Sequence, residues 1–443
     1  MKINKKSISI AMLLPLLLSC GDQIINKGEW ISITSTSLSV HSTTSNIVSP
    51  FNTSIALKYF KNENKTYSET FDKDLKNKFL SIVSDLHTKF DRHFYYYEDQ
   101  ESKKIVTSVK TINDSYGSGE EIFCSEELYK LIKDGYRLTI DTNGYFNFFI
   151  GKLNDYWDGI FHDYNDELIY NDRIIDPLYD EEYRNELNRL TYAVPTLEEV
   201  RNLITFNDEN KSVIFNVLED KEYNGELLSR SNKTSLYRPL LTPGGIAKGL
   251  LVDYLKSSLL NDSYTDGFIN AGSSSLSSLS DLSFTEKGYQ AISITDPRGD
   301  NPFQREKALT VKLYKDYGLS TSGVYTIGKS YQIKDPKDEN KIVYRHHIVN
   351  PYTGECSQYH ASVSLFSSTF SNAELDALST TFVNLSIEDS LLFKEELLEK
   401  YPNHDLKFIM MDFANDDKLK IHIDNELKEN VEINATNVEV SYE

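Results

Sequence analysis

The chain reads Asn372-Ala373-Glu374-Leu375-Asp376-Ala377-Leu378-Ser379-Thr380 at the start of a predicted helix over residues 372–385. Residues at positions i and i+4 leave the same face of a helix, so the Asp376 carboxylate and the Thr380 hydroxyl would lie side by side. Both groups are hard oxygen donors, which suit Mg²⁺ better than Zn²⁺. The alternative is an exposed helix whose acidic residue is stabilised by the positive end of the helix dipole.

A turn rich in polar residues precedes this helix and reads His346-His347-Ile348-Val349-Asn350-Pro351-Tyr352-Thr353-Gly354. A histidine beside a metal-bound phosphate could act as a base or donate a hydrogen bond, whereas a lone histidine more often has a structural role. The two adjacent histidines do not suit a zinc site, because neighbours on a strand point to opposite faces.

A glycine-rich segment reads Pro243-Gly244-Gly245-Ile246-Ala247-Lys248-Gly249 at the entry to another predicted helix. Such a turn exposes backbone N–H groups and lets a ligand approach closely, and Lys248 could add a cation. The spacing is not that of a P-loop, and plain helix entry is the alternative. The histidine turn and the pair of Asp376 and Thr380 together predict a site that holds a phosphate-bearing ligand through a hard metal ion.

Hydrophobic periodicity predicts a mixture of helices and strands. Helices are expected over residues 75–90, from Ser125, from Thr242, over 372–385 and over 387–400. Strands are expected over 51–59, 361–365 and 419–423, with a small hairpin around 207–210. We expect residues 163–195 to form an acidic surface excursion and 272–280 to form a loop. The elements show no steady βαβ rhythm, so the predicted class is α+β.

The composition limits the partners of the chain. Its 443 residues carry a formal net charge of −20. An acidic surface argues against nucleic acid, which requires Lys and Arg to neutralise phosphates. Contact with an anionic ligand must then be local, through a metal, a helix N-terminus or a few placed cations.

The N-terminus is similar to a bacterial lipoprotein signal. Lys2, Lys5 and Lys6 precede an apolar run over 8–18 that is too short to span a bilayer, and Cys20 follows it. We therefore predict a signal peptide over 1–19, lipidation of Cys20 and an anchored protein on the extracytoplasmic face of the cell membrane. An ordinary secretory signal with a chance cysteine is the alternative. Residues 20–49, rich in Ser and Thr, are predicted to form a flexible tether.

The order of the motifs resembles the ApbE family, whose members are FAD:protein FMN transferases and often lipoproteins. The resemblance runs over roughly residues 50 to 425. It is carried by Phe51-Asn52-Thr53, Lys110-Thr111-Ile112-Asn113, Gly144-Tyr145-Phe146-Asn147, Gly244 to Gly249, Asn270 to Ser274, Thr321-Ser322-Gly323, His347 to Gly354 and Asp376 to Thr380.

The resemblance implies a fold of two intertwined α/β subdomains with an FAD cleft between them. The domain is expected over 50–430, with a C-terminal tail over 431–443. Asp376 and Thr380 match the family's side-chain ligands for Mg²⁺, and the Ala247 carbonyl matches its backbone ligand. The expected FAD-contacting residues are Phe51, His93, Tyr145, Phe146, Asn147, Gly244, Lys248, Leu250, Val349, Asn350 and Thr353.

The implied reaction moves FMN from FAD to a threonine hydroxyl of a membrane or extracytoplasmic protein and releases AMP. His347 is the candidate base and Asp376 its rival. A Mg²⁺-dependent FAD pyrophosphatase and a non-catalytic FAD-binding lipoprotein remain alternatives, and a surface adhesin is the alternative without flavin.

The chain departs from the family pattern at three places. Thr242 replaces the usual Asp before the glycine pair, Gly272-Ser273 replaces a Gly-Gly, and Asn350-Pro351-Tyr352 replaces Asp-Pro-Arg. These changes weaken the predicted phosphate and adenine contacts, whereas the residue pair predicted to bind the metal is intact. Cys124 and Cys356 could pair outside the cytoplasm, but the sequence does not show that they meet.

Overall fold

The computed structural model of the chain describes residues 28–42, 45–166, 169–170, 173–279, 282, 285, 288–298, 306–324, 330–413 and 418–443. The predicted signal peptide and Cys20 lie outside these residues, and so does the first part of the predicted tether. Within the described ranges, no helix is both long and apolar enough to cross a membrane.

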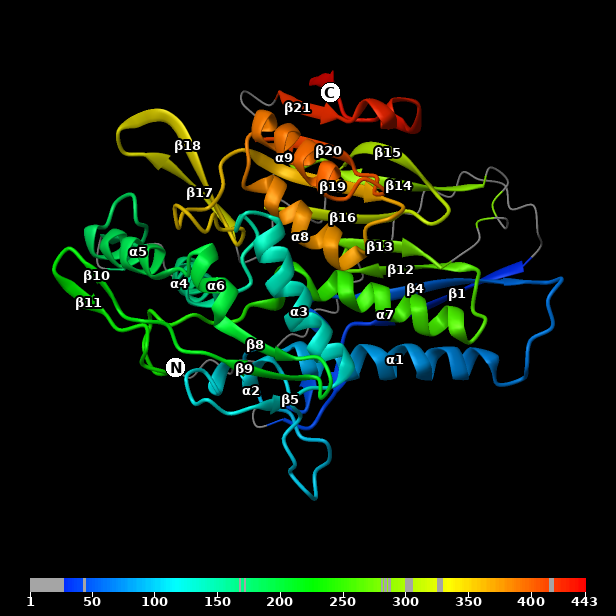
Figure 1. The fold of residues 1–443 in the computed structure, drawn as a ribbon. Helices are drawn as coiled ribbons and strands as arrows, with labels where there is room; N and C mark the ends of the chain where they lie inside the picture. The colour runs from blue at the N-terminus through cyan, green and yellow to red at the C-terminus, as the bar shows by residue number, and fades with distance from the viewer. Residues whose placement is uncertain are drawn as a thin grey trace, which may run out of the picture.

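A nine-stranded sheet forms the centre of the molecule (Figure 1). Neighbouring strands are antiparallel except for the last pair, which is parallel. In spatial order the strands are β1 (Gly28–Ser35), β4 (Ile55–Asn62), β12 (Gly267–Ala271), β13 (Ser275–Ser278), β16 (Gly318–Gly323), β19 (His360–Ser367), β20 (Lys407–Asp412), β21 (Leu419–Ile423) and β23 (Val438–Tyr442). The mixture of this sheet with helices confirms the α+β class.

Helices cover one face of this sheet, and their apolar residues build its two larger cores. They are α1 (Phe71–Phe90), α3 (Glu126–Asp141), α7 (Ala247–Asn261), α8 (Asn372–Val383) and α9 (Ile387–Lys400). The Ser125 hydroxyl caps α3 by accepting a hydrogen bond from Leu128 N, as its position in the sequence predicts. The five predicted helices are therefore confirmed to within a few residues at their ends.

A small three-stranded sheet covers the other face. It consists of β14 (Tyr289–Thr295), β15 (Lys307–Tyr314) and β22 (Val431–Ile433), and it shares a core with the central strands. All eight residues of β19 are consequently buried, whereas the sequence pattern suggested a half-buried strand. A strand between two covered faces has no solvent side, so alternation in its sequence carries no information about exposure.

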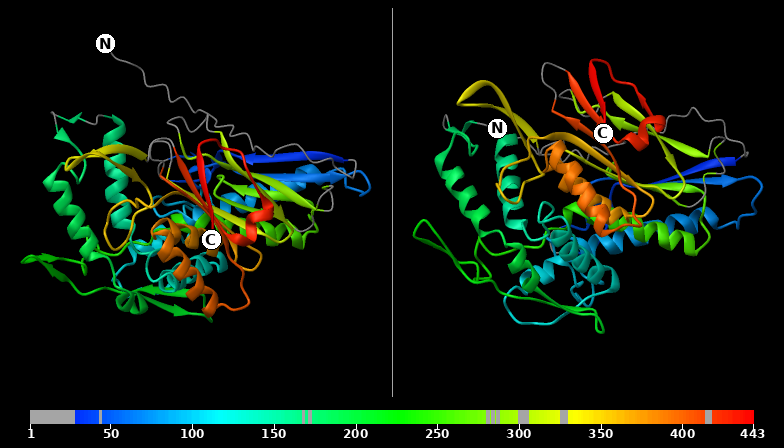
Figure 2. Two further views of the ribbon diagram at one scale, coloured as in Figure 1. Left: turned by 90° about the horizontal axis from the view of Figure 1, so that it is seen from above. Right: turned by 45° about the horizontal axis from the view of Figure 1, so that its top comes forward.

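A lobe beside the sheet holds α4 (Gly151–Asp166), α5 (Glu181–Ala193), β17 (Ser330–Asp335) and β18 (Asp338–His346). Figure 2 shows these elements, in green and yellow, to one side of the central strands. They have their own apolar core around Trp157 and Leu187. The prediction of a surface excursion over 163–195 is therefore wrong in its described part, because α5 packs its apolar side against α4.

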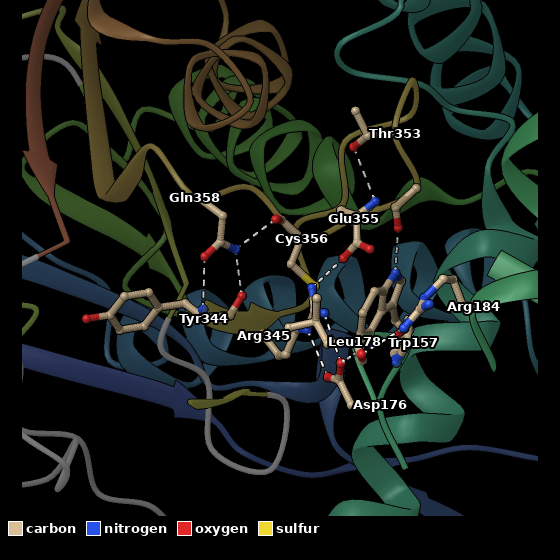
Figure 3. A network of polar contacts seen from close by, with 12 residues as sticks. Trp157, Asp176, Leu178, Arg184, Tyr344, Arg345, Thr353, Glu355, Cys356 and Gln358 are labelled. Carbon is tan, nitrogen blue, oxygen red and sulfur yellow. Dashed lines mark hydrogen bonds and ion pairs between the residues drawn. The ribbon is translucent and has the colours of Figure 1, made fainter. Parts of the chain in front are cut away.

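The lobe is held by a buried ion pair between Asp176 and Arg345, which no local pattern reveals (Figure 3). Arg345 donates from Nε and Nη2 to the two carboxylate oxygens at 2.9 and 3.0 Å. Tyr331 Oη donates to the same carboxylate at 2.7 Å, and Glu355 pairs with Arg345 Nη1. The guanidinium also lies 5.0 Å from the Trp157 ring centroid, so the Arg345 charge has carboxylate and aromatic partners.

The folded domain extends beyond both of its predicted ends, residues 50 and 430. The tether prediction over 20–49 is wrong for Gly28–Ser35, which pair with β4 along their whole length as β1. The tail prediction over 431–443 is wrong as well, because β22 and β23 add to the two sheets. Short alternating strands such as β1 gain their stability from cross-strand contacts, so a Ser- and Thr-rich composition concealed them.

Candidate functional site

Asp376 is the centre of the candidate site. It lies in α8 with only 4% of its surface exposed, so the alternative of an exposed helix is wrong. Its Oδ1 accepts hydrogen bonds from the hydroxyls of Ser275 and Ser320 at 2.5 Å each, and its Oδ2 accepts one from Gly249 N at 2.7 Å. Burial raises the pKa of this carboxyl, while Lys248 and the three donors act in the opposite direction.

Thr380 and the glycine-rich turn lie next to this carboxylate. The Thr380 hydroxyl donates to the Asp376 carbonyl at 3.1 Å. A Cβ atom on Gly245 would lie 3.5 Å from Thr380 Oγ1 and 2.9 Å from Phe146 Cε2. The absence of a side chain at Gly245 therefore lets the turn approach both residues. The structure thus brings together the two segments that carry the residues predicted to bind metal.

The helices α7 and α8 touch directly at this point. A Cβ atom on Gly249 would overlap the backbone of Asn372 and Ala373. Asp253, one turn further along α7, accepts hydrogen bonds from Asn372 N and Ala373 N at 3.0 Å each, where α8 begins. Burial raises the pKa of Asp253 to about 6 against the effect of these donors. Asp253 therefore fixes the helix that carries Asp376, a role that the sequence did not indicate.

Gly249→Ala is expected to lower the free energy of unfolding by about 1–3 kcal/mol, the usual effect of overpacking. The added methyl group must push α8 away, which would also lengthen the Gly249 hydrogen bond to Asp376. Urea unfolding measures the effect. Gly159→Ala in α4 is the matched control, because nothing lies within 4 Å of its added Cβ atom. Equal stability of the two variants would contradict the close crossing of α7 and α8.

A group of serines surrounds Asp376 on the side of the sheet. Besides Ser275 and Ser320, the Ser379 hydroxyl lies 2.8 Å from Ser322 Oγ and 3.3 Å from Ser320 Oγ. Ser275 belongs to β13, within the segment 272–280 that was predicted to be a loop; that prediction is wrong for Ser275–Ser278. A run of small hydroxyl residues is typical of a loop, so the sequence predicted one here. Pairing of β13 in the sheet directs the Ser275 hydroxyl toward the Asp376 carboxylate.

The histidine turn contains one structural histidine. His346 is fully buried; its Nε2 donates to the Ser357 carbonyl at 2.6 Å and its Nδ1 accepts from Ile348 N at 3.2 Å. Burial lowers the pKa of His346 to about 3, so the ring is neutral. His347 is half-buried directly beside it. His346 is thus occupied on both nitrogens, and His347 remains the candidate base.

Asn350 shapes the turn rather than acting as a free ligand in this structure. Its Oδ1 accepts from Tyr352 N, and its carbonyl accepts from Gly354 N, at 2.9 Å each. Thr353 is exposed, and its hydroxyl accepts from Glu355 N at 3.3 Å. An aspartate could accept the same hydrogen bond in this Asx turn, so the local geometry is kept at a position where the family pattern has an aspartate and only the charge is lost.

Asn384, directly after α8, joins the turn to the aromatic loop. Its Nδ2 donates to the carbonyls of Tyr145 and Val349 at 3.2 and 3.3 Å. The Tyr145 and Tyr352 rings meet edge to face with centroids 5.2 Å apart. The helix that carries Asp376 and Thr380 therefore also positions Tyr145 and Val349, two of the predicted FAD contacts.

The other predicted FAD contacts differ in exposure: some are buried and others are exposed or half-buried. Phe146, Asn147 and Leu250 are buried, and Asn147 Oδ1 accepts from Phe149 N at 2.9 Å. Gly244 is exposed, and Lys248 is half-buried with its Nζ 3.5 Å from the Gly244 carbonyl. His93 is exposed on the loop after α1, and Phe51 packs against that helix.

The residues predicted to bind metal fit a hard divalent cation. Ala247 at the start of α7, Asp376 and Thr380 offer a carbonyl, a carboxylate and a hydroxyl, the oxygen donors that Mg²⁺ prefers. The part of the chain that the structure describes contains no group of three or more His, Cys, Asp or Glu side chains that could hold a metal. A transition-metal site built from such groups is therefore absent there. Cys124 and Cys356 are both free thiols.

Solved structures share this fold at low sequence identity. The ApbE protein of Thermotoga maritima matches with a TM-score of 0.55 and 19% identity, over 86% of this chain and 94% of that chain. The flavin transferase ApbE of Vibrio cholerae matches with a TM-score of 0.57 and 15% identity, over 91% and 100%. The flavinyl transferase ApbE of Pseudomonas stutzeri matches with a TM-score of 0.52 and 14% identity, over 88% and 92%.

A search of curated proteins returns no match. The family comparison, in contrast, covers most of the chain, since the ApbE family matches residues 51–402. This range includes the glycine-rich turn, the histidine turn and the helix with Asp376 and Thr380. The chain belongs to the ApbE family.

Proposed function

We propose that the protein is an FAD:protein FMN transferase that depends on Mg²⁺. The observation that carries this proposal is the buried Asp376, placed against Thr380 and the glycine-rich turn. The family match and the flavin transferases among the similar structures support it. Mg²⁺ held by Ala247, Asp376 and Thr380 would neutralise the pyrophosphate of FAD, which a protein of net charge −20 otherwise repels.

The proposed reaction is a phosphoryl transfer. A bond forms between a threonine Oγ of the acceptor and the phosphorus on the FMN side of FAD. The bond from that phosphorus to the bridging oxygen breaks, and AMP leaves with this oxygen. The hydroxyl proton passes to a base. Such reactions depend on positioning and charge neutralisation more than on covalent help from the protein.

The surrounding residues would supply the positioning. Lys248 would place its ammonium near the phosphates, since its Nζ lies 3.5 Å from the Gly244 carbonyl at the glycine-rich turn. Gly245 leaves room for a close approach. His347 is the proposed base because both ring nitrogens of His346 are engaged; Asp376 is the less favoured candidate, because one of its oxygens already accepts two hydroxyls.

Flavin fluorescence on an acceptor tests the proposal. The mature protein is incubated with FAD, Mg²⁺ and a candidate membrane or extracytoplasmic acceptor, and the acceptor is separated by gel electrophoresis. We expect a fluorescent acceptor band that carries FMN on threonine and an equal amount of AMP. Release of FMN and AMP without an acceptor would instead favour an FAD pyrophosphatase. Tight FAD binding without turnover would favour a non-catalytic binding lipoprotein.

The lipid anchor on Cys20 remains part of the proposal. Seven residues separate Cys20 from Gly28, where β1 begins. An extended chain spans at most about 3.6 Å per residue, so the anchored sheet would stand within about 30 Å of the bilayer surface. Incorporation of labelled palmitate by the wild type, and its loss in Cys20→Ala, would support the anchor.

A further inference from the structure

Phe51 has a backbone conformation that a bulky residue rarely adopts. Its φ and ψ are 50° and 28°, in the left-handed region, and Asn52 follows with φ of 56°. Such a conformation is unfavourable for phenylalanine and persists only where the surrounding structure enforces it. Residues of this kind gather at ligand sites, so the contacts of Phe51 indicate what the strain accomplishes.

His87 of α1 supplies the enforcing contact. Its Nδ1 accepts a hydrogen bond from Phe51 N at 3.2 Å. Its ring meets the Phe51 ring at an angle of 67° with centroids 5.4 Å apart, and Phe90 packs against Phe51 at 6.3 Å. The backbone and the side chain of Phe51 are therefore both held from the same helix.

The hydrogen bond requires a neutral His87 with its proton on Nε2. Tyr96 Oη lies 3.3 Å from Nε2 and donates its own proton to Asp91 Oδ2 at 2.6 Å. Its oxygen therefore accepts from Nε2, which leaves the Nδ1 lone pair for Phe51 N. Tyr96 and the charged Asp91 are the titratable groups that face the ring. Burial lowers the pKa of His87, although Asp91 acts in the opposite direction.

The Phe51 turn lies at the same end of the sheet as Asp376. It leads into β4, whose Ile55 pairs with Ala271 of β12. Gly272 N donates to the Ser54 carbonyl at 2.9 Å, and the same short turn leads to Ser275, which donates to Asp376. The turn with Phe51 therefore adjoins the connection that holds the candidate metal-binding carboxylate.

We infer that His87 is a positioning residue whose neutral imidazole holds Phe51, an expected FAD contact, in its left-handed conformation. The inference rests on the proposed function, because it takes FAD as the ligand that Phe51 contacts. When His87 gains a proton on Nδ1, this nitrogen becomes a donor and can no longer accept the hydrogen bond from the N–H of Phe51. The turn then relaxes toward an ordinary conformation, and the affinity for FAD falls in acid.

Two substitutions at position 87 separate the hydrogen bond from the packing. His87→Asn keeps an oxygen acceptor near the position of Nδ1 but cannot gain a proton there. His87→Leu keeps the volume and removes the acceptor. FAD binding is measured by fluorescence quenching from neutral to acid pH. We expect His87→Leu to bind about tenfold more weakly at neutral pH, because the partly buried N–H of Phe51 loses its acceptor, and His87→Asn to bind nearly as the wild type does.

The affinity for FAD at acid pH gives the second measurement. Because burial lowers the pKa of His87, the wild type should lose affinity only as the pH falls through this lowered pKa, below the ordinary value of histidine, and His87→Asn should not. Wild-type affinity in a folded His87→Leu would overturn the inference. If His87→Leu fails to fold, an unchanged acid loss in His87→Asn would overturn it. Absence of FAD binding by the wild type would overturn the proposed function as well, so the two failures are distinguishable.

Discussion

Asp376→Ala is expected to reduce FMN transfer by about a thousandfold or more, because the loss of a metal ligand removes several kcal/mol of charge stabilisation. The carboxylate is the only charged group of the three proposed ligands Ala247, Asp376 and Thr380. Its removal also leaves the hydroxyls of Ser275 and Ser320 and the N–H of Gly249 without their acceptor, so some loss of stability is expected beside the loss of activity. The acceptor-fluorescence assay measures transfer, and thermal unfolding checks the fold.

Two further variants sharpen the interpretation. Asp376→Asn keeps the shape and most hydrogen-bond partners but not the charge, so it should lose nearly as much activity. Glu374→Gln changes a carboxylate two residues earlier in α8, where Glu374 pairs with Arg137 at 2.7 Å. Glutamine preserves the capping box there, and transfer should change less than about threefold. Transfer at the wild-type rate by Asp376→Ala would exclude Asp376 as a metal ligand.

Asp176→Ala is expected to lower the free energy of unfolding by about 3 kcal/mol, because Arg345 loses the partner of its Nε and Nη2 in the interior and keeps only Glu355 at Nη1. Asp176 and the Arg345 side chain are 0% and 2% exposed. Arg345 directly precedes the histidine turn, and Glu355 directly follows it. The variant should therefore also bind FAD more weakly. Urea unfolding and FAD titration measure the two effects.

The matched controls separate burial from charge. The double variant Asp176→Leu with Arg345→Met should recover most of the stability, since neither charge is then left alone. Glu439→Ala breaks the ion pair with Lys418, in which both side chains are about half exposed. This exposed pair should contribute less than about 1 kcal/mol. If Asp176→Ala behaved like Glu439→Ala, the ion pair would not hold the lobe.

The helices were largely predictable because their signals are local. The run from Leu75 to Phe90 repeats its apolar residues at spacings of three and four, and α1 buries five of them. Ser125 marks helix entry by short-range chemistry, because its hydroxyl caps α3. Thr242 makes no such cap, and α7 begins only at Ala247. The Asp376 and Thr380 pair could be recognised from the local sequence as well, because a separation of four residues fixes their common helical face.

The failures share a physical cause. β13 pairs with the adjacent β12 and also with β16 further along the chain, and β1 and β23 pair with β4 and β21. Pairing in the sheet stabilises these short strands, and their polar residues conceal them in the sequence. Residues 163–195 looked like a surface excursion because the whole segment is acidic and rich in turn formers. One of its acids, Asp176, is buried against Arg345, which lies 169 positions away. The contact between His87 and Phe51 was not predicted, because the sequence reveals neither the backbone conformation of Phe51 nor the tautomer of His87.

The sequence by itself determined the class of the fold, the helices and the order of the motifs that define the family. Only the tertiary structure decided the environment of Asp376. Its donors Ser320, Ser275 and Gly249 lie 56, 101 and 127 positions away. Helical periodicity depends on neighbours within one turn, whereas burial and the pKa of a carboxyl depend on whatever packs around it. The same residue that reads as a helix surface therefore becomes a buried, hydrogen-bonded carboxylate once α7, β13 and β16 converge on it.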